Sequence, residues 1–252
     1  MDLNQEEISS LNQKAKQLRK EIIDLAVEKQ DFHPGGELSS IELLVALYNL
    51  ILKPQDKFLL GKGHNCYSMY CLLRQKGYNP IISKHPDIDE KNNISCTSGS
   101  LGHALPIAAG MAFARKLEKK PGHIYVLLGD GECQEGTLWE TSLLLKHYKL
   151  DNLTTIIDYN KIQGSDHLEK ILPLPENLKA TFENLGWHTL EIEGHSFSQI
   201  IPALQQETSG KPKMIIAHTI KGKGISFMEN NPLWHGGVPK GEQLKQAYEE
   251  LK

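Results

Sequence analysis

IYVLLGDGECQEGTLWETSLLLKHY, residues 124–148, is the stretch that decides the fold of this chain. It begins with five apolar residues in a row, which is typical of a strand that is buried on both faces. Gly129, Asp130 and Gly131 follow at once, and glycine allows the backbone to turn tightly there. The rest of the stretch has the length and composition of a helix. We therefore expect a buried strand, a tight turn and a helix in succession.

Three further strand-like runs lie toward the C-terminus, at 153–158 (LTTIID), 187–193 (WHTLEIE) and 213–219 (KMIIAHT). Segments of helical length separate them. This alternation predicts an α/β fold with a doubly wound, mainly parallel sheet and helices on both faces. Ligands of such sheets bind beyond the carboxyl ends of the strands, so we expect the functional site just after each strand.

The N-terminal part of the chain is expected to be helical. Residues 5–30 carry an apolar stripe at helical spacing, and residues 65–76 and 103–119 have helical patterns too. A further helix is expected to begin at a cap formed by Ser39 and Ser40 and to stop before Pro54. Residues 221–240 are rich in Gly, Asn and Pro, which favours a long ordered loop.

Composition excludes several classes of protein. The 252 residues carry 28 Lys and Arg against 31 Asp and Glu, and a net charge of -3 gives no reason to expect binding to nucleic acid. We also expect no membrane segment, because no run reaches the roughly 18 apolar residues that are needed, and a cytoplasmic location follows from the lack of a signal peptide. The cysteines do not have zinc-site spacing, and reduced thiols are expected at Cys66, Cys71, Cys96 and Cys133.

Asp130 and Asn160 are the first candidates for a metal site. Asp130 follows one predicted strand, and Asn160 ends the next, so parallel pairing would bring them to the same edge. A carboxylate beside a bound diphosphate is repelled unless a hard cation lies between them, and Mg²⁺ prefers about six oxygen ligands. The competing interpretation is an ordinary surface turn at Asp130 and a strand end at Asn160.

The segments GDGECQEGTLWE and DYNKIQG match the GDG…N motif of thiamine-diphosphate enzymes, and residues 10 to 240 resemble the N-terminal half of transketolase. Several more stretches carry the resemblance: FHPGGELSS at 32–40, GKGHNCYS at 61–68, KHPD at 84–87, TSGSLGHALPIAAGMA at 97–112 and KGKGISFMENNPLWHG at 221–236. The resemblance implies that the whole chain, residues 1–252, is one diphosphate-binding domain with 221–240 as its active-site loop.

The resemblance also implies the site residues and the cofactors, thiamine diphosphate and Mg²⁺ or Ca²⁺. The metal ligands would be Asp130, Asn160 and the main-chain oxygen of Ile162. The cofactor would contact His64, Gly99, Leu101, Gly129, Gly131, Glu135, Asn160 and His235. Glu135 would in addition join the two cofactor sites across a subunit interface. His33, His85 and His235 would be catalytic, since imidazole can donate or accept a proton near neutrality.

The implied reaction moves a two-carbon ketol unit from a ketose phosphate to an aldose acceptor through a thiamine diphosphate carbanion. In the family, the acid that protonates the aminopyrimidine and the arginines that bind sugar phosphates lie in the other half of the molecule. We therefore interpret the chain as a split subunit that is inactive alone. Its expected partner is a separate C-terminal transketolase-like, pyrimidine-binding subunit, in an α2β2 heterotetramer.

Two other functions remain open at this stage. The chain could belong to another thiamine-diphosphate enzyme, either acyloin-forming, 2-oxo-acid-processing or acting on a specialised sugar, or it could be a non-catalytic partner without cofactor. The HPGG and KGH stretches favour polyhydroxylated substrates. His103 and the segment 163–168 depart from the family pattern. Lys221 and Lys223, in the loop, are interpreted as solvated lysines.

Overall fold

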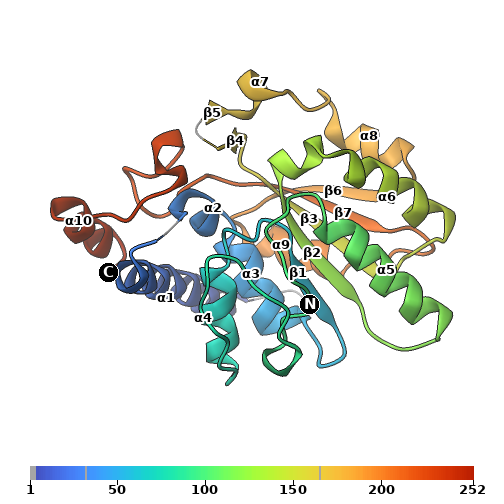
Figure 1. Cartoon of the computed structure of the whole chain (residues 1–252), viewed down its shortest axis with the longest axis horizontal. Helices are drawn as coiled ribbons and strands as arrows, with labels where there is room; N and C mark the ends of the chain where they lie inside the picture. The colour runs from blue at the N-terminus through green and yellow to red at the C-terminus, as the bar shows by residue number, and fades with distance from the viewer. Residues whose placement is uncertain (1–3, 32, 165) are drawn as a thin grey trace.

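A sheet of five parallel strands runs through the molecule (Figure 1). The computed structural model describes residues 4–31, 33–164 and 166–252, so Phe32 and Ser165 of the predicted motifs lie outside the described residues. The order of the strands in the sheet is β1-β2-β3-β7-β6. Their bounds are Lys57–Leu60 for β1, Ile124–Gly129 for β2, Leu153–Tyr159 for β3, His188–Glu193 for β6 and Lys213–His218 for β7.

Helices cover both faces of this sheet, as Figure 1 shows. One face packs against α1 (Gln5–Lys29), α3 (Ile41–Ala46), α4 (Tyr67–Gln75) and α9 (Phe197–Gln205). The other packs against α5 (Ala104–Leu117), α6 (Gly136–His147) and α8 (Leu178–Asn184). Within β2, Leu127 belongs to the first core and Val126 and Leu128 to the second, because side chains alternate along a strand. The predicted α/β class with helices on both faces is confirmed.

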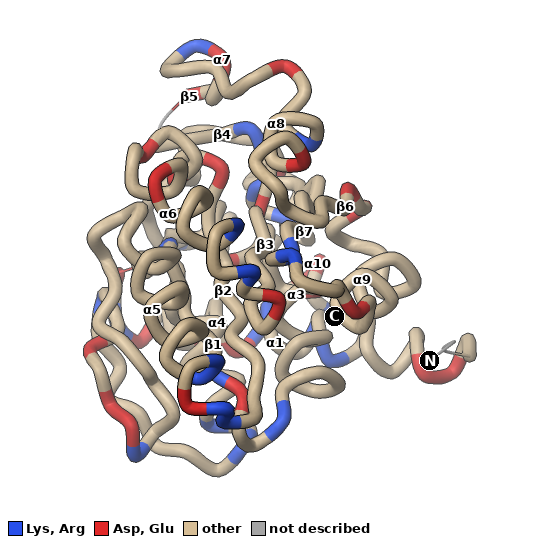
Figure 2. Tube along the Cα trace, turned by 90° about the vertical axis from the view of Figure 1, so that its right-hand side faces the viewer, with Lys and Arg blue, Asp and Glu red and all other residues tan. Residues whose placement is uncertain are grey.

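Shorter elements connect these layers. They are α2 (Pro34–Ser39), η1 (Leu47–Ile51), η2 (Glu90–Asn92), η3 (Asp130–Gln134), the antiparallel pair β4 (Ile162–Gln163) and β5 (Asp166–His167), α7 (Leu168–Ile171), η4 (Pro232–His235) and α10 (Glu242–Glu250). The C-terminal α10 lies beside α1, where the hydroxyl of Tyr248 donates to Asp24 over 2.6 Å. Positions of both charges are interspersed along the trace in Figure 2. Among the described residues, no helix has the length and apolar character needed to cross a bilayer.

The predicted helix start at Ser39 and Ser40 was wrong. A short helix, α2, already begins at Pro34, whose fixed φ suits the first helical position. The side chain of Ser40 makes no cap hydrogen bond and its hydroxyl is buried without a partner among the described residues. The helical path then continues through α3 into η1, which is π-helical.

The turn after β2 also differs from the expectation. Asp130 does not open the following α-helix, because the 3₁₀ helix η3 intervenes and α6 begins only at Gly136. The carboxylate of Glu132 accepts from the nitrogens of Gly129 and Gly102 at 2.8 and 3.0 Å, which holds this tight turn against the segment before α5. The two glycines of the turn are therefore placed by a buried acid rather than by an α-helix N-terminus.

Candidate active site

The carboxyl ends of β2 and β3 lie side by side. The two strands are parallel neighbours, with Gly129 paired to Asp158. Beyond that pair, Asp130 Oδ2 accepts a hydrogen bond of 2.6 Å from the nitrogen of Lys161, and Oδ1 accepts one of 2.8 Å from Gly131. The predicted juxtaposition of the two strand ends is therefore present in the fold.

A cavity of about 340 Å³ opens at this edge of the sheet. Eight of the predicted site residues line it: His64, Leu101, Gly129, Asp130, Gly131, Asn160, Ile162 and His235. The residues come from β2, η3, β3, β4 and the 221–240 loop, which are separate in sequence. The fold therefore gathers the predicted diphosphate and metal residues around one space.

The oxygens of Asp130, Asn160 and Ile162 fit a hard cation. The side-chain nitrogen of Asn160 donates to Asp158 Oδ2 at 3.2 Å and its oxygen accepts from the nitrogen of Ile162 at 3.1 Å, which fixes the orientation of the amide. Burial, followed by the nearby charge of Asp158, raises the pKa of Asp130 to about 7. No group of three His, Cys, Asp or Glu suited to a metal occurs among the described residues. A dication here would thus need the amide and main-chain oxygens, which Mg²⁺ and Ca²⁺ accept.

Asp158 and Lys62 form a buried ion pair beneath the cavity. Asp158 Oδ2 lies 2.5 Å from Lys62 Nζ, and the same carboxylate accepts from the hydroxyls of Ser39 (2.6 Å) and Thr219. Burial alone would raise the pKa of Asp158, but Lys62 outweighs it and holds the pKa below its ordinary value. Sequence reasoning missed this pair, although an acid inside the apolar run LTTIIDYN was a usable signal, because buried acids are nearly always paired.

Lys221 is buried rather than solvated, so the prediction made for this lysine was wrong. Only 3% of its surface is exposed. Its ammonium group donates to the main-chain oxygen of Ile162 at 2.9 Å and lies 3.4 Å from Nδ1 of His235. A cation therefore stands at the predicted metal and diphosphate end of the cavity, and Lys221 joins the site.

Three of the predicted histidines form a cluster. The ring centroids of His33, His64 and His235 lie 5.4 to 5.7 Å from one another. Burial, followed by nearby lysines, lowers the pKa of His64 to about 3 and that of His235 to about 4, and burial also lowers the pKa of His33. All three rings are therefore neutral near pH 7, so each has one donor and one acceptor nitrogen.

His85, Gly99 and Glu135 are placed outside the cavity lining. The side chain of His85 is exposed, and its ring lies 3.0 Å from the point where a Cβ on Gly99 would stand. Gly99 itself has a φ of +139°, a conformation that favours glycine. Glu135 packs against Gly102, where an added Cβ would come within 2.6 Å of it. These three residues surround the segment that carries Leu101, whose side chain is 38% exposed at the cavity.

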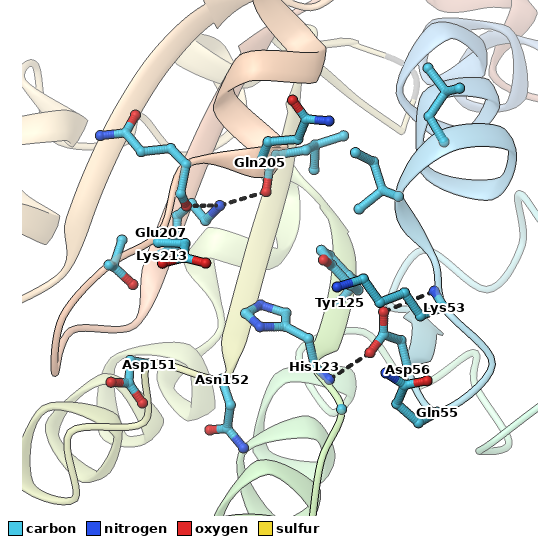
Figure 3. A pocket seen from close by; sticks show the side chains of 16 residues that line it. Lys53, Gln55, Asp56, His123, Tyr125, Asp151, Asn152, Gln205, Glu207 and Lys213 are labelled. Carbon is cyan, nitrogen blue, oxygen red and sulfur yellow. Dashed lines mark hydrogen bonds between the residues drawn. The ribbon is translucent and has the colours of Figure 1, made fainter. Parts of the chain in front are cut away.

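A larger hollow, of about 520 Å³, lies at the amino ends of the strands, on the opposite edge of the sheet (Figure 3). Its polar groups are engaged with the protein itself. The ammonium of Lys213 donates to the carbonyl oxygens of Ala203, Leu204 and Gln206 at the end of α9, and Asp56 accepts from the nitrogens of Lys53 and His123. These contacts close chain ends and turns, so we assign the chemistry to the smaller cavity.

Comparison with known proteins agrees with this geometry. The family described as transketolase, thiamine diphosphate binding domain, matches residues 10–251. One of the two subunits of an apulose-4-phosphate transketolase from Phocaeicola vulgatus is 36% identical over 97% of this chain and 95% of that protein. The 6-deoxy-6-sulfo-D-fructose transketolase subunit of Clostridium sp. (strain MSTE9) is 37% identical over 87% of this chain and 88% of that protein.

Solved structures add the match in fold. A transketolase from Campylobacter jejuni superposes with a TM-score of 0.86 and 29% identity, covering 99% of this chain and 43% of that one. The chain therefore spans less than half the length of that solved relative, whereas it spans nearly the whole length of the subunit from Phocaeicola vulgatus.

Proposed function

The chain belongs to the transketolase family, and we propose that it is the diphosphate- and metal-binding subunit of a two-component transketolase that transfers a two-carbon ketol unit from a ketose phosphate to an aldose acceptor. The observation that carries the proposal is the meeting of Asp130, Asn160 and the Ile162 carbonyl at one cavity between the ends of β2 and β3. A hard dication bound by these oxygens would neutralise a diphosphate beside Gly129 and Gly131.

We assign each cavity residue a role toward thiamine diphosphate. Asp130, Asn160 and the Ile162 carbonyl would bind Mg²⁺ or Ca²⁺, and Lys221, His64 and His235 would contact the phosphate oxygens. The cofactor, when bound, supplies the nucleophilic carbon for ketol transfer. The protein supplies its position and the electrostatics.

The neutral histidines suit a polyhydroxylated substrate. His33 and His235 belong to the ring cluster beside the cavity, and His85 approaches from the segment before Gly99. A neutral imidazole donates from one nitrogen and accepts at the other, so it can bind a sugar hydroxyl and take or return its proton. Gly99, Leu101 and Glu135 would shape the remaining wall and the contact to a second subunit.

The partner in this proposal is a separate C-terminal, pyrimidine-binding subunit, in an α2β2 heterotetramer. The relatives named as transketolase subunits support it, because they have nearly the length of this chain and act, by their names, on apulose-4-phosphate or 6-deoxy-6-sulfo-D-fructose. The same names favour a specialised sugar over a 2-oxo acid as the donor. Residues 1–252 would form one domain with 221–240 as the active-site loop. Four free cysteines support a reducing, cytoplasmic setting.

Co-expression of this chain with a transketolase-like pyrimidine-binding subunit from the same organism tests the proposal. We expect ketol transfer from a panel of ketose phosphates only for the pair, with Mg²⁺ and thiamine diphosphate present, and a light-scattering mass of two copies of each chain. Asp130→Ala, assembled in the same way, is the control that removes the metal ligand. Full activity of the lone chain, or turnover of 2-oxo acids alone, would refute it.

A further inference from the structure

The segment that carries Lys221 is held at its main chain on both sides of that residue. The nitrogen of Ile220 donates to Nε2 of His195 at 2.8 Å, and the carbonyl of Lys223 accepts from Nε of Arg19 at 2.8 Å. Both partners are remote in sequence, since Arg19 belongs to α1 and His195 precedes α9. Between the two anchored groups, Lys221 extends its side chain to the Ile162 carbonyl.

The two partners are joined to each other by Glu42 of α3. Nη2 of Arg19 lies 2.7 and 3.0 Å from the two carboxylate oxygens, and Nδ1 of His195 lies 2.9 Å from Oε2. Glu42 and Arg19 are 7% and 6% exposed. Burial alone would raise the pKa of Glu42, yet Arg19 and His195 hold it below the ordinary value. The three side chains thus form one buried, charged unit.

The hydrogen bonds fix the tautomer of His195. Because Ile220 donates its N–H to Nε2, that nitrogen must be the unprotonated one, and the proton of a neutral ring then sits on Nδ1, which donates to Glu42. A carboxylate therefore orients the ring, and the ring orients the peptide group that precedes Lys221.

Stability alone does not explain this arrangement. Burying an ion pair is often no better for stability than an apolar replacement of the same volume, whereas directed hydrogen bonds specify one geometry. The loop is shaped to receive the unit, since Gly224 has a φ of +96° and a Cβ there would stand 2.9 Å from Nε of Arg19. Gly222 in turn donates to the carbonyl of Gly35 at 2.9 Å, which ties the loop to α2.

We propose that Arg19, Glu42 and His195 are positioning residues that clamp the main chain around Lys221, so that its ammonium group stays at the diphosphate end of the cavity. This inference rests on the proposed function, since it assigns Lys221 to diphosphate binding. The three residues touch neither cavity nor ligand; they act through the Ile220 nitrogen and the Lys223 carbonyl.

Two substitutions at His195 separate positioning from stability. A glutamine places its amide group near the position of Nε2, so H195Q keeps an acceptor for Ile220 and loses the donor to Glu42. An asparagine places its amide near Nδ1, so H195N keeps the partner of Glu42 and releases Ile220. We expect H195N to weaken binding of inorganic pyrophosphate, measured calorimetrically on the full chain with saturating Mg²⁺, by about tenfold with a small change in Tm. H195Q should lower Tm more and affinity less.

The matched control is His218→Asn. His218 pairs with Glu191 over 3.1 Å, but both side chains are more than 40% exposed on β7 and β6. This variant should bind pyrophosphate like the wild type. Hydrogen exchange at the Ile220 amide gives a second readout, and it should be faster in H195N than in H195Q.

A double-mutant cycle with Lys221→Met decides whether the clamp acts through that lysine. Lys221→Met alone should weaken pyrophosphate binding, and adding H195N should weaken it no further. If Lys221→Met weakens binding but H195N binds normally, or if the two losses multiply, the clamp is overturned and the diphosphate site stands. If the wild type binds no pyrophosphate, or Lys221→Met binds as well as the wild type, the proposed diphosphate site fails and the clamp falls with it.

Discussion

Oδ2 of Asp130 accepts a hydrogen bond of 2.6 Å from the nitrogen of Lys161, so the side chain at the end of β2 is attached to the segment that leaves β3. The other oxygen accepts from Gly131 at 2.8 Å. Each carboxylate oxygen has a second lone pair, and these remain for a cation. The carboxylate is therefore aligned by the backbone of both strand ends before any metal binds.

We expect Asp130→Asn to lower Mg²⁺-dependent pyrophosphate affinity by about 100-fold, a loss of the size seen when groups that support a metal are removed. The amide is neutral and can accept at only one of its two positions, so it neither attracts a dication nor satisfies both backbone donors. Calorimetric titration with and without Mg²⁺ measures the effect. Asp166→Asn is the control, because Asp166 is the acid of an exposed ion pair with Lys170. Equal affinities of Asp130→Asn and wild type would contradict the metal assignment.

Lys62→Met tests the buried ion pair beneath the cavity. Lys62 and Asp158 have side chains that are 4% and 0% exposed, so the substitution leaves a carboxylate without its counter-ion. The expected loss in the free energy of unfolding is about 3 to 5 kcal/mol, measured by urea denaturation. The double variant Lys62→Met/Asp158→Asn should recover part of it.

A second lysine provides the comparison for that experiment. Lys170 pairs with Asp166 at 3.2 Å, but these side chains are 62% and 47% exposed. Lys170→Met should change the free energy of unfolding by no more than about 0.5 kcal/mol. A similar loss for both lysines would show that the position beneath the cavity is not special.

Most of the sheet was predictable because its strands carry the signal themselves. β2, β3, β6 and β7 are apolar or β-branched runs bounded by turn residues, and their burial follows from that composition. The edge strand β1 was missed, since KFLL at Lys57–Leu60 is only four residues long and has no period of its own. It becomes a strand because β2 offers it a parallel partner from Lys57 to Leu60.

The candidate site divides in the same way. Asp130 and Asn160 could be brought together on paper, because parallel register and strand order suffice to place them. Lys221, Lys62 and Asp158 were not recognised as site residues. Burial of a charged side chain depends on segments that are distant in sequence, and for Lys221 these include the β4 carbonyl of Ile162 and η4 at His235. No local pattern around a lysine in a Gly-rich loop carries that information.

Gly131→Ala tests the fit of the turn to a diphosphate. An added Cβ would stand 3.0 to 3.3 Å from the Gln163 side chain, which is tight but at a side chain that can shift, and it would enter the cavity. We expect pyrophosphate affinity to fall about tenfold while Tm changes little. Gly136→Ala is the matched control, because the nearest atom to its Cβ would be Glu140 Oε1 at 3.9 Å. Unchanged affinity for Gly131→Ala would place the diphosphate elsewhere.

The clustered histidines make stability depend on pH in a defined direction. The folded pKa is about 3 for His64 and about 4 for His235, first because of burial and then because of Lys62 and Lys221 respectively. In the unfolded chain both return to about 6.5. As the pH falls from 6.5 toward 4, the unfolded chain binds protons that the folded chain does not, so the free energy of unfolding falls. Above pH 6.5 both states are neutral at these positions and the effect disappears.

Replacing both histidines should therefore flatten the acid side of the stability profile. Wild type should lose more free energy of unfolding between pH 7 and pH 5 than His64→Gln/His235→Gln, by about 1 kcal/mol for each histidine. Urea denaturation at pH 7, 6 and 5 measures it, with exposed His147→Gln as the control that follows wild type. Identical losses for wild type and the double variant would mean that these rings take up protons in the folded chain, and the neutral imidazoles assigned to sugar binding would then be wrong.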